Sequence, residues 1–209
     1  MKLNYGDQEF IMHSSGCLYW PSREALLIAD VHFGKVDHFR KNGSALPSRV
    51  GLENFKKLNI VLKEFDPKAL IFLGDLFHST QNKDWERFKN WVEHQTVDMT
   101  LIVGNHDIIP HYQFEDIGFK VVKELFVDAI FLTHHPEEKP NFYNICGHLH
   151  PGYRLVGMGR QHLKLSCFYK RKYQLILPAF GAFTGLFLIE PEEEEKVYVL
   201  SEDVVHSVN

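Results

Sequence analysis

Acidic, amide and histidine residues follow five short apolar segments of this chain, at the point where each segment ends. The segments and the residues that follow them are Ala25–Ala29 with Asp30 and His32, Ala69–Leu73 with Asp75, Leu101–Val103 with Asn105, His106 and Asp107, Ile130–Thr133 with His134 and His135, and Tyr143–Cys146 with His148 and His150. A short apolar run bounded by glycine and polar residues is typical of a buried strand. Because ligands of an open α/β sheet collect outside the carboxyl ends of its strands, we expect these side chains to meet at one edge of the core. Such a set of acids and imidazoles favours a two-metal hydrolytic site.

Each of these patterns also has an ordinary explanation when it is taken alone. Asp-x-His arises often by chance, and Gly-Asp after a strand is a common turn. Gly104 and Asn105 are also residues that turns commonly use. A turn does not need the His-Asp pair that follows them, and Asp107 can orient His106 by accepting its ring N–H. A single buried histidine is usually satisfied by a backbone carbonyl. That explanation weakens when four histidines lie between His134 and His150.

The pattern of apolar residues in the first half of the chain predicts alternating strands and helices. Short antiparallel strands are expected at Phe10–His13 and Cys17–Trp20, before the Ala25 segment. A helix is expected after Ser48, a candidate N-cap, and should stop at Asp66-Pro67. Its inward residues recur at three- and four-residue spacing: Leu52, Phe55, Leu58, Val61, Leu62 and Phe65.

A second helix is expected to start near Asp84, with an inward face made by Trp85, Phe88, Trp91 and Val92. Strands that alternate with helices up to Val103 imply parallel strands joined by right-handed crossovers.

Beyond Ile108, closely spaced strands dominate. They are expected near Lys120–Val122, Glu124–Val127, Ile130–Thr133, Leu163–Tyr169, Gln174–Leu177, Phe187–Ile189 and Val197–Leu200. Two sheets packed face to face, with helices outside, would account for both halves. We therefore expect an α/β fold in one domain that spans residues 1–209.

The bulk composition fits this expectation. The 209 residues are 44% hydrophobic, and the formal net charge of −4 indicates no particular partner. Cys17, Cys146 and Cys167 show no metal-binding spacing and are expected to be buried free thiols. The N-terminus shows no signal peptide, and no apolar stretch approaches the roughly 20 residues of a membrane span, so a cytoplasmic protein without a membrane partner is expected.

The order of the motifs, Asp-x-His, Gly-Asp, Gly-Asn-His-Asp, His and Gly-His-x-His, resembles the signature of the calcineurin-like metallophosphoesterase superfamily. Several segments also resemble the bacterial branch of ligase-associated DNA-damage-response endonucleases or phosphoesterases. They are Asp30-Val-His-Phe-Gly-Lys35, Arg40, Leu46-Pro47, Leu73-Gly-Asp-Leu-Phe-His78, His134-His-Pro136, Leu177-Pro-Ala-Phe-Gly181 and Phe183-Thr-Gly185. The resemblance implies an α/β/β/α sandwich, in which two mixed β-sheets are flanked by helices.

The resemblance also implies how two divalent metal ions are held. The first ion would take Asp30, His32 and His150, the second Asn105, His134 and His148, and Asp75 would bridge them. His135 is a weaker candidate, because the superfamily's histidine is the first residue beyond the strand. Nitrogen and oxygen donors without thiolate suit Mn, Fe or Zn, and Mg less well. Among these metals, the resemblance to the superfamily favours Mn²⁺.

The mechanism implied by this site is hydrolysis by a hydroxide shared between the two ions. His106 is the candidate general acid or hydrogen-bond donor, with Asp107 holding its tautomer. Lys35, Arg40 and His78 are candidate substrate contacts; a solvated lysine and a histidine that supports the ligands are the alternatives.

The substrate is indicated by a segment that lacks acidic residues. From Lys139 through Ile189 there is no Asp or Glu, while seven residues are positively charged: Lys139, Arg154, Arg160, Lys164, Lys170, Arg171 and Lys172. A basic surface beside a phosphodiesterase centre would attract a polyanion through its phosphates, although Lys170-Arg171-Lys172 is better explained as an ordinary basic hairpin turn.

Three functions therefore compete. They are a phosphodiesterase or nuclease acting on DNA or nucleotide diesters, a small-molecule phosphatase or pyrophosphatase, and a non-catalytic protein-binding scaffold. Complete ligation favours an enzyme, and the resemblance implies work beside a DNA ligase and a helicase.

Overall fold

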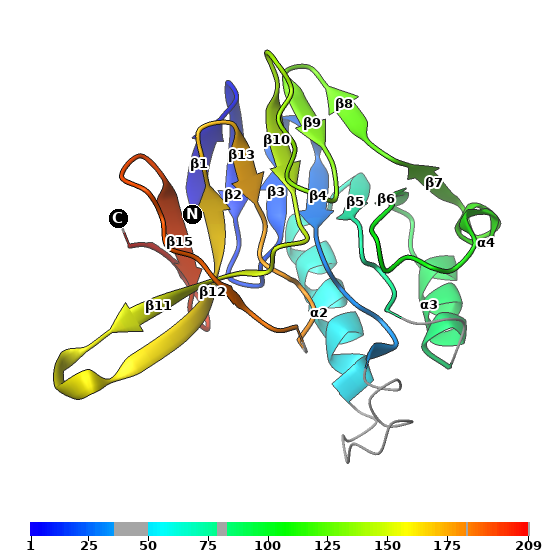
Figure 1. The fold of residues 1–209 in the computed structure, drawn as a ribbon. Coiled ribbons are helices and arrows are strands. Elements are labelled where there is room, and N and C mark those ends of the chain that lie inside the picture. The colour runs from blue at the N-terminus through cyan, green and yellow to red at the C-terminus, as the bar shows by residue number, and fades with distance from the viewer. Residues whose placement is uncertain (36–49, 79–82, 183, 209) are drawn as a thin grey trace.

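The computed structural model describes residues 1–35, 50–78, 83–182 and 184–208 (Figure 1). Within them, seven strands form a first sheet in chain order. They are β1 (Lys2–Tyr5), β2 (Gln8–Met12), β3 (Leu18–Trp20), β4 (Ala25–Ile28), β5 (Ala69–Leu73), β6 (Asp98–Ile102) and β7 (Phe119–Val122). Strands β1 to β4 pair antiparallel, and β4 to β6 pair parallel as the alternation with helices predicted. Strand β7 also pairs parallel, and it joins the first sheet although it was expected with the second half of the chain. Strand β1 was not expected from the sequence.

The two expected helices are present as α2 (Val50–Phe65) and α3 (Lys83–Glu93). With Phe114 of the short helix α4 (His111–Glu115), they pack on one face of the first sheet in an aromatic-rich cluster. Leu52 departs from the predicted inward face and is 39% exposed, because it lines an open groove between α2 and α3. The candidate N-cap Ser48 lies outside the described residues.

The second sheet is also mixed and has the order β14-β11-β12-β13-β10-β9-β8, with β15 and β16 added beside β12. Its strands are β8 (Leu125–Val127), β9 (Ile130–Leu132), β10 (Tyr143–Cys146), β11 (Pro151–Val156), β12 (His162–Lys170), β13 (Gln174–Ile176), β14 (Phe187–Leu188), β15 (Lys196–Leu200) and β16 (Val205–Ser207). Strands β11 and β16 were not expected. Two sheets in a sandwich confirm the expected fold class.

The space between the sheets is filled by side chains from both. Leu27, Ile71 and Ile102 of the first sheet share one cluster with Ile145 and Phe168 of the second. Neighbouring residues on each strand point the other way, because side chains alternate across a strand. Burial on both faces explains why these strands appear in the sequence as continuous apolar runs.

A smaller apolar cluster lies on the outer face of the second sheet and contains Cys146, Cys167 and Tyr169. All three cysteines, Cys17 included, are free and buried, as expected. None of the described helices has the length and apolar character needed to cross a bilayer.

Candidate metal centre

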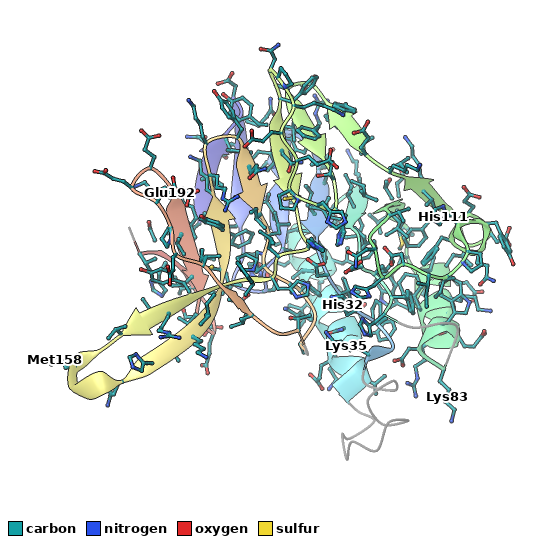
Figure 2. The ribbon with its side chains drawn as sticks, viewed as in Figure 1. His32, Lys35, Lys83, His111, Met158 and Glu192 are labelled. Carbon is teal, nitrogen blue, oxygen red and sulfur yellow. The ribbon has the colours of Figure 1, made fainter. Side chains whose placement is uncertain are left out.

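The expected site residues follow strands of both sheets and converge at one edge of the sandwich, where Figure 2 labels His32. Strands β4, β5 and β6 run parallel in the first sheet, and β9 and β10 run parallel in the second. Parallel strands end at the same edge, so the residues after them emerge together. Asp30, Asp75 and His134 offer ligand atoms that all lie within 4.8 Å of one another, although more than 100 residues separate the first from the last.

The backbone at this edge adopts left-handed conformations that other residues rarely take. The φ angles are 55° at Asp30, 52° at His32, 49° at Asp75, 70° at His148 and 49° at His150. Each such non-glycine residue costs on the order of 1–3 kcal/mol unless the surroundings hold it. Here the surroundings are other loops, because the Asp30 N–H donates to the Gly74 carbonyl at 3.2 Å and the His32 N–H to the Asp75 carbonyl at 3.0 Å. Backbone strain is therefore concentrated on the candidate ligands.

Two glycines allow the loops to approach this closely. A Cβ on Gly104 would lie 2.3 Å from both the amide nitrogen and Oδ1 of Asp75. A Cβ on Gly147 would lie 2.6 Å from Oδ2 of Asp30. Both glycines are needed for space beside a carboxylate, and neither has a left-handed backbone.

The first donor set contains Asp30, His32 and His150. The distance from His150 Nε2 to Asp30 Oδ1 is 3.4 Å, and the two Nε2 atoms of His32 and His150 lie 3.3 Å apart. Ligand atoms that share one ion, at bond lengths of about 2.1 Å, lie roughly 3 to 3.5 Å apart. These three side chains therefore have the spacing of a single coordination sphere.

The second donor set is defined by the tautomer of His134. Its Nδ1 lies 2.9 Å from the Leu73 carbonyl, which can only accept, so this nitrogen carries a proton and the neutral form of the ring presents its lone pair at Nε2. That Nε2 lies 3.0 Å from Asn105 Oδ1 and 3.2 Å from His148 Nδ1. A lone pair that faces an acceptor oxygen at this distance is unfavourable without a cation between them.

Asp75 lies between the two donor sets. Its Oδ1 is 3.4 Å from His134 Nε2, and its Oδ2 is 3.9 Å from His32 Nε2. The His106 N–H also donates to Oδ1 at 2.9 Å. The carboxylate thus directs one oxygen to each set, which is the arrangement that a bridging ligand needs.

Burial favours the neutral form of the His32 and His148 imidazoles, which is the form that binds metals. Burial lowers the pKa of His32 to about 2, with further lowering by Lys35 and the neighbouring histidines. Burial also lowers the pKa of His148, and His135 and His134 add to the effect. Their close contacts with carboxylates are therefore not ordinary salt bridges.

The residues fit a divalent cation on a further observation. Asp30 is fully buried, and its Oδ1 accepts no hydrogen bond from any described residue, whereas its Oδ2 accepts one from the His148 N–H at 2.9 Å. A buried carboxylate oxygen without a donor is costly, and a cation would satisfy it.

His135 also lies at the second set. Its ring centroid is 4.1 Å from that of His148 and 4.7 Å from that of His134. Candidate ligand atoms of the three histidines lie within 4.8 Å of one another. The geometry offers His135 as a further donor, although the sequence ranked it below His134.

His106 and Asp107 were expected to act as a pair, but the structure gives the two side chains different partners. His106 is exposed, and its ring centroid lies 5.7 Å from that of His32. Asp107 is buried and accepts the N–H groups of Gly104 at 2.8 Å and Phe77 at 3.1 Å. With both carboxylate oxygens occupied by backbone donors, Asp107 shapes the loop instead of bonding the His106 ring. Its burial raises its pKa to about 6.

Of the three candidate substrate contacts, two are described. The pKa of Lys35 is lowered by burial and raised in part by Asp75 and Asp30, so its ammonium lies in the field of the site. The ring of His78 lies 4.7 Å from that of His106 and 5.4 Å from that of His32. Arg40 lies outside the described residues.

Sequence reasoning missed a support for the first metal loop. Asn54 of α2 donates to the Val31 carbonyl at 2.9 Å and accepts from the Ala182 N–H at 3.2 Å. Lys57, one turn later, donates to the Phe180 carbonyl at 2.7 Å. The available signal was a polar residue on the buried face of a helix. Both side chains fasten the 180–182 segment beside Asp30.

Comparison with known proteins identifies the family. A model of calcineurin-like phosphoesterases matches residues 25–175. The chain is similar to the crystal structure of the Pseudomonas putida nuclease MPE, with 29% sequence identity, a TM-score of 0.84, and coverage of 100% of this chain and 99% of the nuclease.

Two further solved structures share less sequence identity with the chain. A protein of unknown function, AQ665 from Aquifex aeolicus, has 20% identity and a TM-score of 0.44 over 60% of this chain and 78% of its own. The phosphoesterase Yfce from E. coli has 15% identity and a TM-score of 0.40 over 87% of this chain and 90% of its own. No curated protein matches the chain. Because the family model covers more than half of its residues, the chain belongs to the calcineurin-like phosphoesterase family and is a phosphoesterase hydrolase.

Proposed function

We propose that this chain is a two-metal phosphodiesterase that cleaves phosphodiester bonds of DNA. One divalent cation is held by Asp30, His32 and His150, the second by Asn105, His134 and His148, and Asp75 is shared. One observation supports this most directly. His134 Nε2 lies 3.0 Å from Asn105 Oδ1 and 3.4 Å from Asp75 Oδ1, so three side chains from separate loops bring one nitrogen and two oxygens to the spacing of donors around one cation. The mixed nitrogen and oxygen donors suit Mn²⁺.

Divalent cations bound there would lower the pKa of a shared water and offset charge on the phosphoryl oxygens. The chain's own residues hold the ligand loops and position the substrate. Backbone hydrogen bonds and Asn54 keep the ligand loops in place before substrate arrives. His106, exposed beside His32, donates from a ring nitrogen to the leaving oxygen. Lys35 places positive charge where the phosphoryl oxygens gain negative charge.

DNA is preferred as the substrate on two grounds. The solved structure with full-length similarity is a nuclease. The sequence also resembles the ligase-associated DNA-damage-response branch through segments that include His78 and Gly181, which lie beside the donor sets.

The test is an assay of the Mn²⁺-loaded protein on a bis-aryl phosphate, a cyclic nucleotide, single-stranded and duplex DNA, and a simple monoester. Diester and DNA cleavage are expected, and chelation should abolish both. His106→Ala should lower turnover roughly 10²–10⁴-fold. The matched control is His111→Ala, since His111 is exposed on α4 far from His32 (Figure 2) and should leave turnover unchanged. Cleavage of the monoester alone would overturn the phosphodiesterase assignment.

A further inference from the structure

Strand β11 and the first part of β12 extend from the body as a hairpin arm, residues 151–166 (Figure 1). The arm begins at Pro151, directly after the candidate ligand His150. Figure 2 shows Met158 at its far end, away from His32 and Lys35. From Pro151 to Val156 the strand spans roughly 17 Å. The arm therefore leads from the metal centre outwards.

The two faces of the arm differ in character. The register pairs Tyr153 with Leu165 and Leu155 with Leu163, which places four apolar side chains on one face. The alternate pairs, Gly152 with Ser166 and Arg154 with Lys164, lie on the other face. Tyr153 and Leu165 pack against the outer apolar cluster of the second sheet. The face with Arg154 and Lys164 is thus the polar one, and both residues are exposed.

The root of this basic face lies near the metal centre, because Gly152 follows the candidate ligand His150 by two residues. A Cβ on Gly152 would meet Leu186 at 2.8 Å, so the chain around Leu186 covers the root of the same face. That chain comes from Gly181, whose N–H donates to the carbonyl of Asp30 at 3.0 Å. Gly181 therefore contacts the backbone of the candidate ligand Asp30, and Leu186 contacts the root of the basic face.

The structure divides the acid-free segment of the sequence into two parts. Lys139 pairs with Glu124 at 2.8 Å and Arg171 pairs with Glu195 at 3.2 Å, so acids from elsewhere neutralise these positions. Lys172 shares a surface hollow with Glu192, Glu193 and Glu194. The preference for an ordinary hairpin turn at 170–172 agrees with this environment.

Arg154 and Lys164 are different. Neither forms an ion pair with any residue in the described ranges, and they lie directly opposite each other. Like charges in opposite positions on paired strands destabilise a sheet. An anion placed against this face would relieve that repulsion.

We propose that the hairpin arm is a docking surface for a DNA strand, which lies along the face of Arg154 and Lys164 and enters the metal centre at His150. The inference rests on the proposed function and adds where the polymer binds. Over roughly 17 Å, one strand of DNA carries about five phosphates, enough to contact both side chains. Contacts of this kind read the backbone and not the base sequence.

The first experiment measures binding without turnover. The full chain is titrated, with chelator present, into a fluorescently labelled single-stranded DNA oligonucleotide at several salt concentrations. For Arg154→Gln/Lys164→Gln, affinity should fall roughly tenfold to a hundredfold at about 50 mM salt, and the slope of log K against log salt should decrease by roughly 1.4, the value for two lost phosphate contacts. The charge-preserving variant Arg154→Lys/Lys164→Arg should bind like the parent.

The matched control is Lys139→Gln/Lys172→Gln, which removes the same net charge from positions that glutamates already face and should leave affinity unchanged. An equal loss in both double variants would show a response to net charge only and would overturn the arm as a docking surface. Unchanged affinity in Arg154→Gln/Lys164→Gln would overturn it as well.

The second experiment separates this inference from the function on which it rests. Turnover of bis-aryl phosphate should be the same in the parent and in Arg154→Gln/Lys164→Gln, because a small diester does not reach the arm, while DNA turnover should fall in that variant. If the parent cleaves no diester, the proposed function fails whatever the arm does. If the parent cleaves both substrates and the variant cleaves DNA equally well, only the arm is refuted.

Discussion

Gly104→Ala is expected to disable the site through a single added methyl group. The new Cβ would lie 2.3 Å from Asp75 N and Oδ1, while ordinary contacts begin near 3.4 Å. Because the backbone of Gly104 is not left-handed, lack of space is the only difficulty. The Asp75 amide belongs to the chain and cannot rotate away, so one of the two loops must move by about 1 Å.

The magnitude follows from that displacement. Overpacking of this kind costs about 1–3 kcal/mol of stability. A misplacement of about 1 Å costs on the order of 10²-fold in rate. We expect Gly104→Ala to lower the free energy of unfolding by that amount, as measured by urea denaturation, and to lower diester turnover about 100-fold in Mn²⁺.

The control is Gly157→Ala, whose Cβ would meet its nearest atom, Gln161 Cβ, at an ordinary 3.7 Å. This exposed position should change stability by less than about 0.5 kcal/mol and leave turnover unchanged. If Gly104→Ala matched the parent in both stability and turnover, the close approach of the two loops would not be a requirement of the site, and the reasoning from Asp75 would fail.

Three further predictions concern other parts of the site. Asp75→Ala should lose both metal ions, which elemental analysis of the purified protein measures; full metal content would contradict the bridging role. Asn54→Ala removes a buried side chain that bonds Val31 and Ala182, and should lower the free energy of unfolding by about 1–3 kcal/mol in urea denaturation; a change below about 0.5 kcal/mol would contradict this. Burial lowers the pKa of Lys57 from 10.5 to about 8, so between these pH values the unfolded chain binds more protons and stability should rise with pH. Lys57→Met should lack that rise, and parallel pH series of urea denaturation should therefore diverge between pH 8 and 10.5; superimposable series would refute the shift.

Local pattern was enough to predict most of the core strands. β4, β5, β9 and β10 lie within a residue of their expected bounds, because each is a continuous apolar run that ends at glycine or a polar ligand. The register of helix α3 was equally readable, since Trp85, Phe88, Trp91 and Val92 are all buried. Strand β11 was missed, because it follows the His148-x-His150 motif and mixes proline, glycine and an exposed arginine, which lack a strand-like alternation.

By itself, the sequence determined which residue types stand at the ends of the strands, and the order of those motifs was sufficient to predict the family. Only the tertiary structure decided how these residues meet. Left-handed backbones at Asp30, Asp75 and His148, and the donation from His134 to the Leu73 carbonyl, depend on contacts between loops that are distant in the chain. Loop packing in the folded chain also decides that the Asp107 carboxylate accepts hydrogen bonds from backbone amides. Spacing along a chain specifies which side chains are available, whereas hydrogen-bond partners and directions depend on which loops pack together.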